Sequence, residues 1–262
     1  MTLSIGTKNS RIMIDSNTKI LLQHLASCYE TPQFIIGDPS WWMHQVQGTL
    51  NQEATAFVAS ALNYGSRSQF MPKIETLLGY AGGDMHRWLA DGAYADRFRS
   101  DDAACFYRLY NCGAMRAFFD AYGNLLAAYG SLGEYVRHEG NGTGLGAVEA
   151  ICRWFAAHGA STVVPKDATS SCKRVCMFLR WMVRDGSPVD LGLWKDIIDP
   201  RTLIMPMDTH VLTEAMKLGL LQSRSASMSA ALKLSAAMRE VFPDDPLRGD
   251  FALFGYGVAP SE

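Results

Sequence analysis

The spacing of the apolar residues constrains the fold of this chain most. They recur at positions i, i+3, i+4 and i+7 over nearly its whole length, so each run lines one face of an α-helix. The clearest runs cover residues 54–62, 115–126, 147–158, 211–216 and 228–238. The alternation of a half-buried strand is nearly absent, and only residues 161–164 fit a short extended piece. The pattern predicts an all-α fold of roughly ten helices with little or no sheet.

Composition narrows the class of protein. Hydrophobic residues make up 48% of the 262 and charged residues 19%, which excludes a disordered or fibrous chain. No apolar run approaches the roughly 20 residues that span a bilayer, so a membrane protein is not expected. Residues 1–16 have no apolar block of the signal-peptide kind. We therefore expect a cytoplasmic protein.

Cysteine and histidine spacing predicts neither a metal site nor a disulfide framework. The six cysteines and six histidines are scattered, and no Cys-x-x-Cys pair occurs. Cys172 and Cys176 share a helix face with Val175 and Leu179, which favours two small buried side chains. We expect no metal and no cofactor.

Charge is unevenly distributed. The net charge of −2 argues against a protein that coats nucleic acid without specificity. Between residues 166 and 184, however, five basic residues face one acidic residue. Such a stripe suits contact with a short length of phosphate backbone, and it also suits an ordinary solvated helix face, which charge alone favours.

Two predicted helix starts carry residues that could take part in a reaction. Lys173 falls in the first turn of a helix preceded by the capping candidates Thr169, Ser170 and Ser171. A lysine there is unfavourable beside the helix dipole, which lowers the cost of losing the proton that a nucleophilic amine must lose. Asp208 precedes an apolar helix that runs to Gly219 and is a strong N-cap candidate. Without further context, a solvated lysine and an ordinary capping aspartate are the simpler interpretations.

The sequence Pro-Met-Asp-Thr-His-Val at residues 206–211 resembles the signature of the helix-hairpin-helix DNA glycosylase superfamily, in which a lysine precedes the aspartate. Lys173 lies 35 positions before Asp208, a spacing similar to that of an archaeal 8-oxoguanine glycosylase branch. Residues 57–68 resemble the helix and loop that enter the minor groove in that superfamily. The Gly-x-Gly of the superfamily's hairpin, whose amides grip a phosphate, is missing from residues 164–172.

A second resemblance covers more of the chain. The strings at residues 172–174, 178–184 and 250–255 resemble those of a conserved bacterial family of unknown function, and this match runs from about Asp38 to Val258. Together the resemblances imply one glycosylase-like unit over residues 1–262 with two helical lobes. One lobe would comprise approximately residues 40–140 with the C-terminal helices, around a hairpin-containing lobe at 145–220.

The superfamily resemblance implies a DNA base-excision glycosylase that acts on a damaged purine such as 8-oxoguanine, and it allows for an additional lyase activity. Lys173 would form a Schiff base with the sugar, and Asp208 would stabilise positive charge on it. Trp181 or Phe254 would stack on the extruded base. The implied nucleic-acid contacts are Asn63, Tyr64, Arg67, Lys166, Ser170, Ser171, Arg174, Arg180 and Arg184.

Alternatives stay open at this point. Arg180 or Arg184 could instead pair with Asp185, Asp190 or Glu214 inside the fold. The chain could keep the fold yet bind damaged duplex DNA, single strands or a modified nucleoside without cleavage, or it could be an unrelated helical interaction protein. We expect a monomer with no membrane contact.

Overall fold

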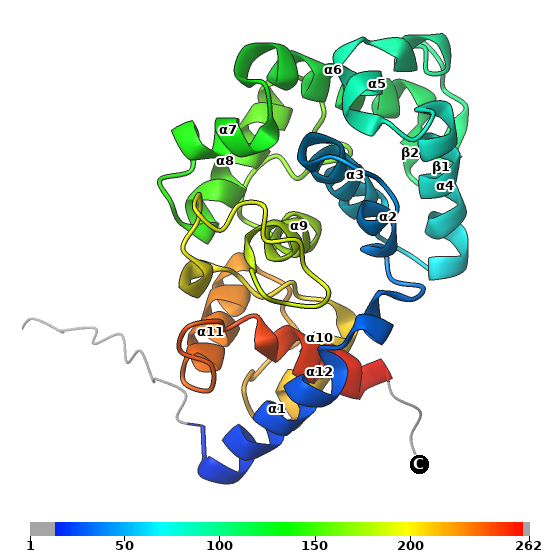
Figure 1. Ribbon diagram of the computed structural model, residues 1–262. Coiled ribbons are helices and arrows are strands. Elements are labelled where there is room, and N and C mark those ends of the chain that lie inside the picture. The colour runs from blue at the N-terminus through cyan, green and yellow to red at the C-terminus, as the bar shows by residue number, and fades with distance from the viewer. Residues whose placement is uncertain (1–13, 259–262) are drawn as a thin grey trace, which may run out of the picture.

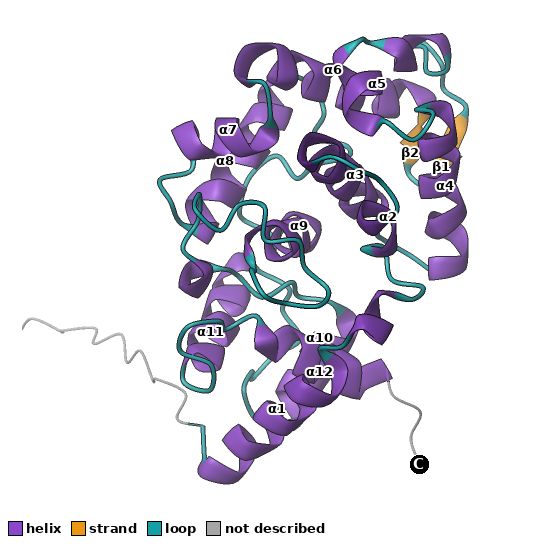
Figure 2. Cartoon of the chain, viewed as in Figure 1, coloured by secondary structure: helices purple, strands orange, loops and turns teal. Residues whose placement is uncertain are grey.

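The computed structural model describes residues 14–258, so most of the N-terminal segment on which the localisation prediction rests lies outside the described residues. Within them the chain forms twelve α-helices, three short 3-10 helices and one two-stranded hairpin, which confirms the all-α prediction (Figures 1 and 2). The helices are α1 (Ser16–Tyr29), α2 (Trp41–His44), α3 (Thr49–Leu62), α4 (Arg67–Tyr80), α5 (Met85–Ala90), α6 (Cys112–Tyr129), α7 (Leu132–Glu139), α8 (Gly144–Ala157), α9 (Lys173–Val183), α10 (Thr209–Lys217), α11 (Met228–Arg239) and α12 (Arg248–Val258). The 3-10 helices are η1 (Pro32–Ile35), η2 (Ala93–Asp96) and η3 (Pro200–Thr202).

Helix α9 lies at the centre of the molecule (Figure 1). Helices α3 to α8 lie on one side of it in this view and α1, α10, α11 and α12 on the other. Its residues from Val175 to Val183 are all buried, although the sequence pattern predicted one buried face and one polar face. The reason is that α9 packs against both α3 and α8, while the loop at residues 191–194 bonds to the carbonyls of Trp181 and Met182, and α12 meets Arg180 through Asp250.

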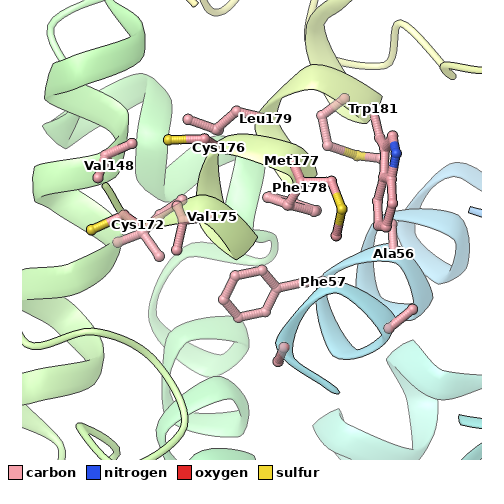
Figure 3. Close-up of a cluster of buried hydrophobic side chains, with 14 of the residues drawn as sticks. Ala56, Phe57, Val148, Cys172, Val175, Cys176, Met177, Phe178, Leu179 and Trp181 are labelled. Carbon is pink, nitrogen blue, oxygen red and sulfur yellow. The ribbon is translucent and has the colours of Figure 1, made fainter. Parts of the chain in front are cut away.

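The apolar runs predicted as helices are confirmed, since four fall within α3, α6, α10 or α11, and the fifth, 147–158, ends at the C-cap of α8. Their aromatic side chains meet around Phe57 of α3. Its ring centroid lies 5.0 to 5.9 Å from those of Phe118, Tyr122, Phe155 and Phe178, which come from α6, α8 and α9. Figure 3 shows Phe57 within the buried cluster that α9 contributes to. Edge-to-face aromatic contacts of this kind stabilise a core beyond the area they bury.

The one small sheet was not predicted. Strands β1 (Cys105–Tyr107) and β2 (Tyr110–Asn111) form an antiparallel hairpin, whereas residues 161–164, the expected extended piece, form turns. Strands of three and two residues are too short for an alternating pattern to emerge.

The C-terminal helix closes the fold. Helix α12 packs along α1 and against α10, which joins the two ends of the described chain (Figure 1). Within residues 14–258, no helix is both long and apolar enough to cross a membrane.

Candidate active site

A pocket of about 230 Å³ opens where five parts of the chain meet. These are the segment around η1, the loop after α3 with the start of α4, and the beginnings of α9 and α10 together with α12. It is lined by Phe34, Asp38, Pro39, Asn63, Gly65, Arg67, Phe70, Lys173, Met177, Arg180, Pro206, Asp208, His210, Asp250 and Phe254. Both residues with predicted chemical roles, Lys173 and Asp208, therefore line one pocket.

Lys173 is the first residue of α9 and is half-buried. Its side-chain amine forms no hydrogen bond or ion pair with any residue in the part of the chain that the structure describes. The predicted capping residues are wrong, because the N-cap is Cys172 in a left-handed conformation, with φ of 46°, and no side chain caps the helix. The preceding turn is instead held to the segment before α11, where the Ser171 amide donates to the carbonyl of Ala226 over 3.0 Å.

Asp208 is the N-cap of α10, as predicted. Its Oδ1 accepts a hydrogen bond from the amide of Val211 over 2.8 Å. The carboxylate is half-buried and has no ion-pair partner among residues 14–258. Asp208 thus ends one helix and borders the pocket at the same time.

A second carboxylate, Asp250 at the start of α12, also lines the pocket. It is buried and accepts a hydrogen bond from Nη1 of Arg180. Burial raises the pKa of Asp250 to about 6, the Arg180 guanidinium opposes the rise, and the negative charge of Asp208 adds to it. Asp208 and Asp250 therefore line the same pocket in different environments, Asp208 half-buried and Asp250 buried.

The pocket-facing arginine is part of a buried ion network. Arg180 Nε lies 3.2 Å from Asp190 Oδ1, and Arg184 Nη2 lies 2.7 Å from Asp245 Oδ2. Arg184 also pairs with Asp190 and with Glu30, the C-cap of α1. The prediction that Arg180 and Arg184 contact phosphates is therefore wrong, because both guanidinium groups are buried and paired. The alternative pairing with Asp190 is confirmed.

Of the two predicted base-stacking residues, the structure brings only Phe254 to the pocket. Trp181 is 0% exposed and belongs to the buried cluster in Figure 3, so its assignment to a base pocket is wrong. The ring of Phe254 is half-buried, with Arg67 over it at 5.7 Å and the His210 ring 5.7 Å away.

The loop after α3 supplies one wall. Asn63 lines the pocket and donates to the Met177 sulfur over 2.9 Å. Arg67 also lines it, exposed and 3.8 Å from Asp38. Tyr64 does not line the pocket, since its half-buried ring is covered by the guanidinium groups of neighbouring arginines.

The remaining predicted contacts lie outside the pocket lining. Arg174 is tied into the fold, with Nη1 donating to the carbonyl of Ala61 over 2.6 Å. Ser171 is buried, so its predicted contact with a phosphate is wrong. Ser170 is exposed, but its hydroxyl accepts from the Cys172 amide over 3.4 Å. Lys166 is exposed and 4.0 Å from its neighbour Asp167.

Sequence reasoning missed several pocket residues. Asp38, Phe34 and Asp250 had no predicted role, and His210 was noted only as part of the signature at 206–211. The buried Asp38 accepts from the amide of Ser40 over 3.0 Å. Asp250 begins one of the strings shared with the bacterial family, and this was the one available signal.

Comparison with known proteins identifies a family whose function is unknown. No curated protein and no solved structure matches the chain. Residues 38–259 match the family described as "Protein of unknown function (DUF2400)", and this range includes every residue that lines the pocket except Phe34. Since the match covers most of the sequence, the chain belongs to this family of proteins of unknown function.

Proposed function

We propose that this protein excises a damaged base from DNA through Lys173 and Asp208. One observation carries the proposal: an amine without a partner in the described chain and a carboxylate without an ion-pair partner there line the same pocket. They begin two helices that are 35 positions apart in the sequence. We further propose that α8, the turn at 158–172 and α9 correspond to the hairpin unit of the helix-hairpin-helix glycosylases.

The chemistry follows from these groups. Breaking a glycosidic bond builds positive charge on the sugar, which the ionised Asp208 stabilises. The neutral amine of Lys173 forms a bond to the sugar C1′ as the bond to the base breaks, and the base leaves with a proton. Ring opening then gives a Schiff base, from which the strand on the 3′ side is released by elimination. The Phe254 ring offers a stacking face for the extruded base.

Borohydride trapping tests the proposal. Incubation with a duplex that contains an abasic site, followed by borohydride, should give a covalent protein–DNA complex. Lys173→Ala should abolish it, whereas Lys233→Ala, which changes an exposed lysine on α11, should leave it intact. On an 8-oxoguanine duplex, Asp208→Asn should lose base release while keeping trapping at a preformed abasic site. Trapping that survives Lys173→Ala would reject the assignment.

One observation supports a second candidate, a protein that binds nucleic acid without cleaving it. The amides of Thr169, Ser171 and Cys172 are already used inside the fold, so the turn before α9 has few donors left for a phosphate. This weakens the anchoring of a duplex that the superfamily obtains from its glycines. Salt-dependent binding with neither trapping nor base release would favour this candidate.

A further inference from the structure

The tip of the β1–β2 hairpin has a composition that is unusual for a turn. Tyr107 pairs with Tyr110, which leaves Arg108 and Leu109 as the connecting residues. Arg108 has a φ of 50°, a conformation that glycine, asparagine and aspartate adopt more readily. Leu109 is 81% exposed, more than any other large apolar side chain among residues 14–258. Neither residue type is the one that turn formation by itself favours.

Contacts to Tyr64 and to α4 hold this tip in place. The Leu109 amide donates to the Tyr64 hydroxyl over 2.9 Å, and Nη1 of Arg108 donates to Oε1 of Gln69 over 3.2 Å. The Arg108 guanidinium lies over the Tyr64 ring at 5.3 Å, and the Tyr107 hydroxyl donates to the Tyr64 carbonyl. Tyr64, predicted from the sequence to contact nucleic acid, instead holds the tip of the hairpin in place.

The tip lies directly beside the wall of the pocket. Gly65 lines the pocket, and a Cβ atom at this position would come within 2.9 Å of Nη1 of Arg108. The hairpin and α4 are also neighbours in Figure 1. Arg67 and Arg108 both expose their side chains along this edge, so the apolar leucine is accompanied by positive charge.

A single exposed leucine needs no explanation by itself. The difference here is that the leucine follows Arg108 on a turn held in place by Tyr64 and α4, next to the wall of the pocket. Proteins that unstack a nucleic acid insert apolar side chains between base steps and hold the adjacent phosphates with basic ones. A turn that is already ordered favours such an insertion, because little conformational entropy is lost on binding.

We propose that Leu109 enters the base stack of DNA beside the nucleotide that the pocket takes up, and that Arg108 contacts the adjacent backbone. The identity of the ligand rests on the proposed function. Leu109, which we call the wedge, would occupy the gap that the extruded base leaves in the stack. Arg67 remains a lining residue of the pocket itself.

The test uses a duplex with a tetrahydrofuran abasic analogue and 2-aminopurine as the neighbouring base, whose fluorescence increases when it is unstacked. Wild-type protein should increase the fluorescence at saturation, Leu109→Ala should lose most of the increase, and Leu109→Met should keep it. Affinity for this duplex should fall by about tenfold in Leu109→Ala, the loss of roughly one apolar insertion. The matched control is Ile20→Ala, an exposed apolar residue on α1.

Trapping on a single-stranded abasic oligonucleotide separates this inference from the proposed function. A wedge is not needed where no stack exists, so Leu109→Ala should trap on the single strand as well as the wild type does. If the wild type gave the fluorescence increase but no covalent trapping, the proposed reaction at Lys173 would be rejected and the insertion of Leu109 would stand. An unchanged fluorescence increase in Leu109→Ala, or no duplex binding by the wild type, would overturn the wedge.

Discussion

The two ends of α9 carry the same kind of residue and use it in opposite ways. At the first turn, Lys173 borders the pocket without a partner in the described chain. At the last turns, Arg180 and Arg184 are buried in ion pairs with Asp190. Glu30 after α1, together with Asp245 and Asp250 from the C-terminal region, supplies their other carboxylate partners. In the sequence these three residues belong to a single basic stripe.

The difference shows that the position of a basic residue in the sequence does not tell whether its charge is paired within the fold or left open to a ligand. A buried guanidinium group is tolerated only with its charge paired and its hydrogen bonds made. The Lys173 amine, in contrast, forms no hydrogen bond or ion pair with the described residues, which makes a chemical role the better explanation of its position. Four measurements test this contrast between the two ends of α9.

The largest effect is expected for Arg184→Ala. The substitution leaves Asp190, Asp245 and Glu30 without their shared cation, and removing one partner of a buried pair costs about 3–5 kcal/mol. Urea unfolding should therefore show a free energy of unfolding lower by that amount. A loss below about 1 kcal/mol, the range of surface ion pairs, would mean that the network is not a structural element.

The next effect concerns pH and Asp250. Its pKa of about 6 lies above the ordinary value of 3.8, so the folded state binds this proton more tightly than the unfolded state does. The stabilisation is full below pH 3.8 and is lost as the pH rises to about 6, by about 3 kcal/mol. Asp250→Asn should remove this slope. Urea unfolding of both proteins from pH 4 to 7 measures it, and parallel curves would refute the elevated pKa.

A smaller effect separates the structural role of Asp208 from its chemical one. Asp208→Ala should lower the free energy of unfolding by about 1 kcal/mol, because the amide of Val211 loses its acceptor. Asp208→Asn should keep the stability, since asparagine caps equally well. Both variants should lose base release. If Asp208→Asn retained base release, the residue would be a helix cap without a catalytic role.

The smallest effect on stability is expected for Lys173→Ala. Because Lys173 has no hydrogen bond or ion pair with the described residues, the free energy of unfolding should change by no more than about 0.5 kcal/mol. Thermal and urea unfolding provide the measurement. A loss of several kcal/mol would place Lys173 with Arg184 as a structural cation and remove the contrast between the two ends of α9.

How far the sequence predicts the fold depends on the length of each element. Helices such as α3 and α6 extend over several turns, so their apolar period is visible, and the Asp208 cap follows from local hydrogen bonding. The β1–β2 hairpin is too short to show a period. The N-cap at Cys172 was missed because the turn before it is held by a distant segment that contains Ala226.

Local chemistry along the chain determined the helical class and the start of α10, which Asp208 caps. Tertiary structure alone decided which basic residues are free, that Trp181 lies in the core, and that Asp38 and Asp250 join the pocket. The physical reason is the separation along the sequence over which each interaction acts. Helix periodicity and capping act within a few residues, whereas burial and ion pairing depend on segments as far apart as Glu30 and Arg184, which meet only when the whole chain has packed.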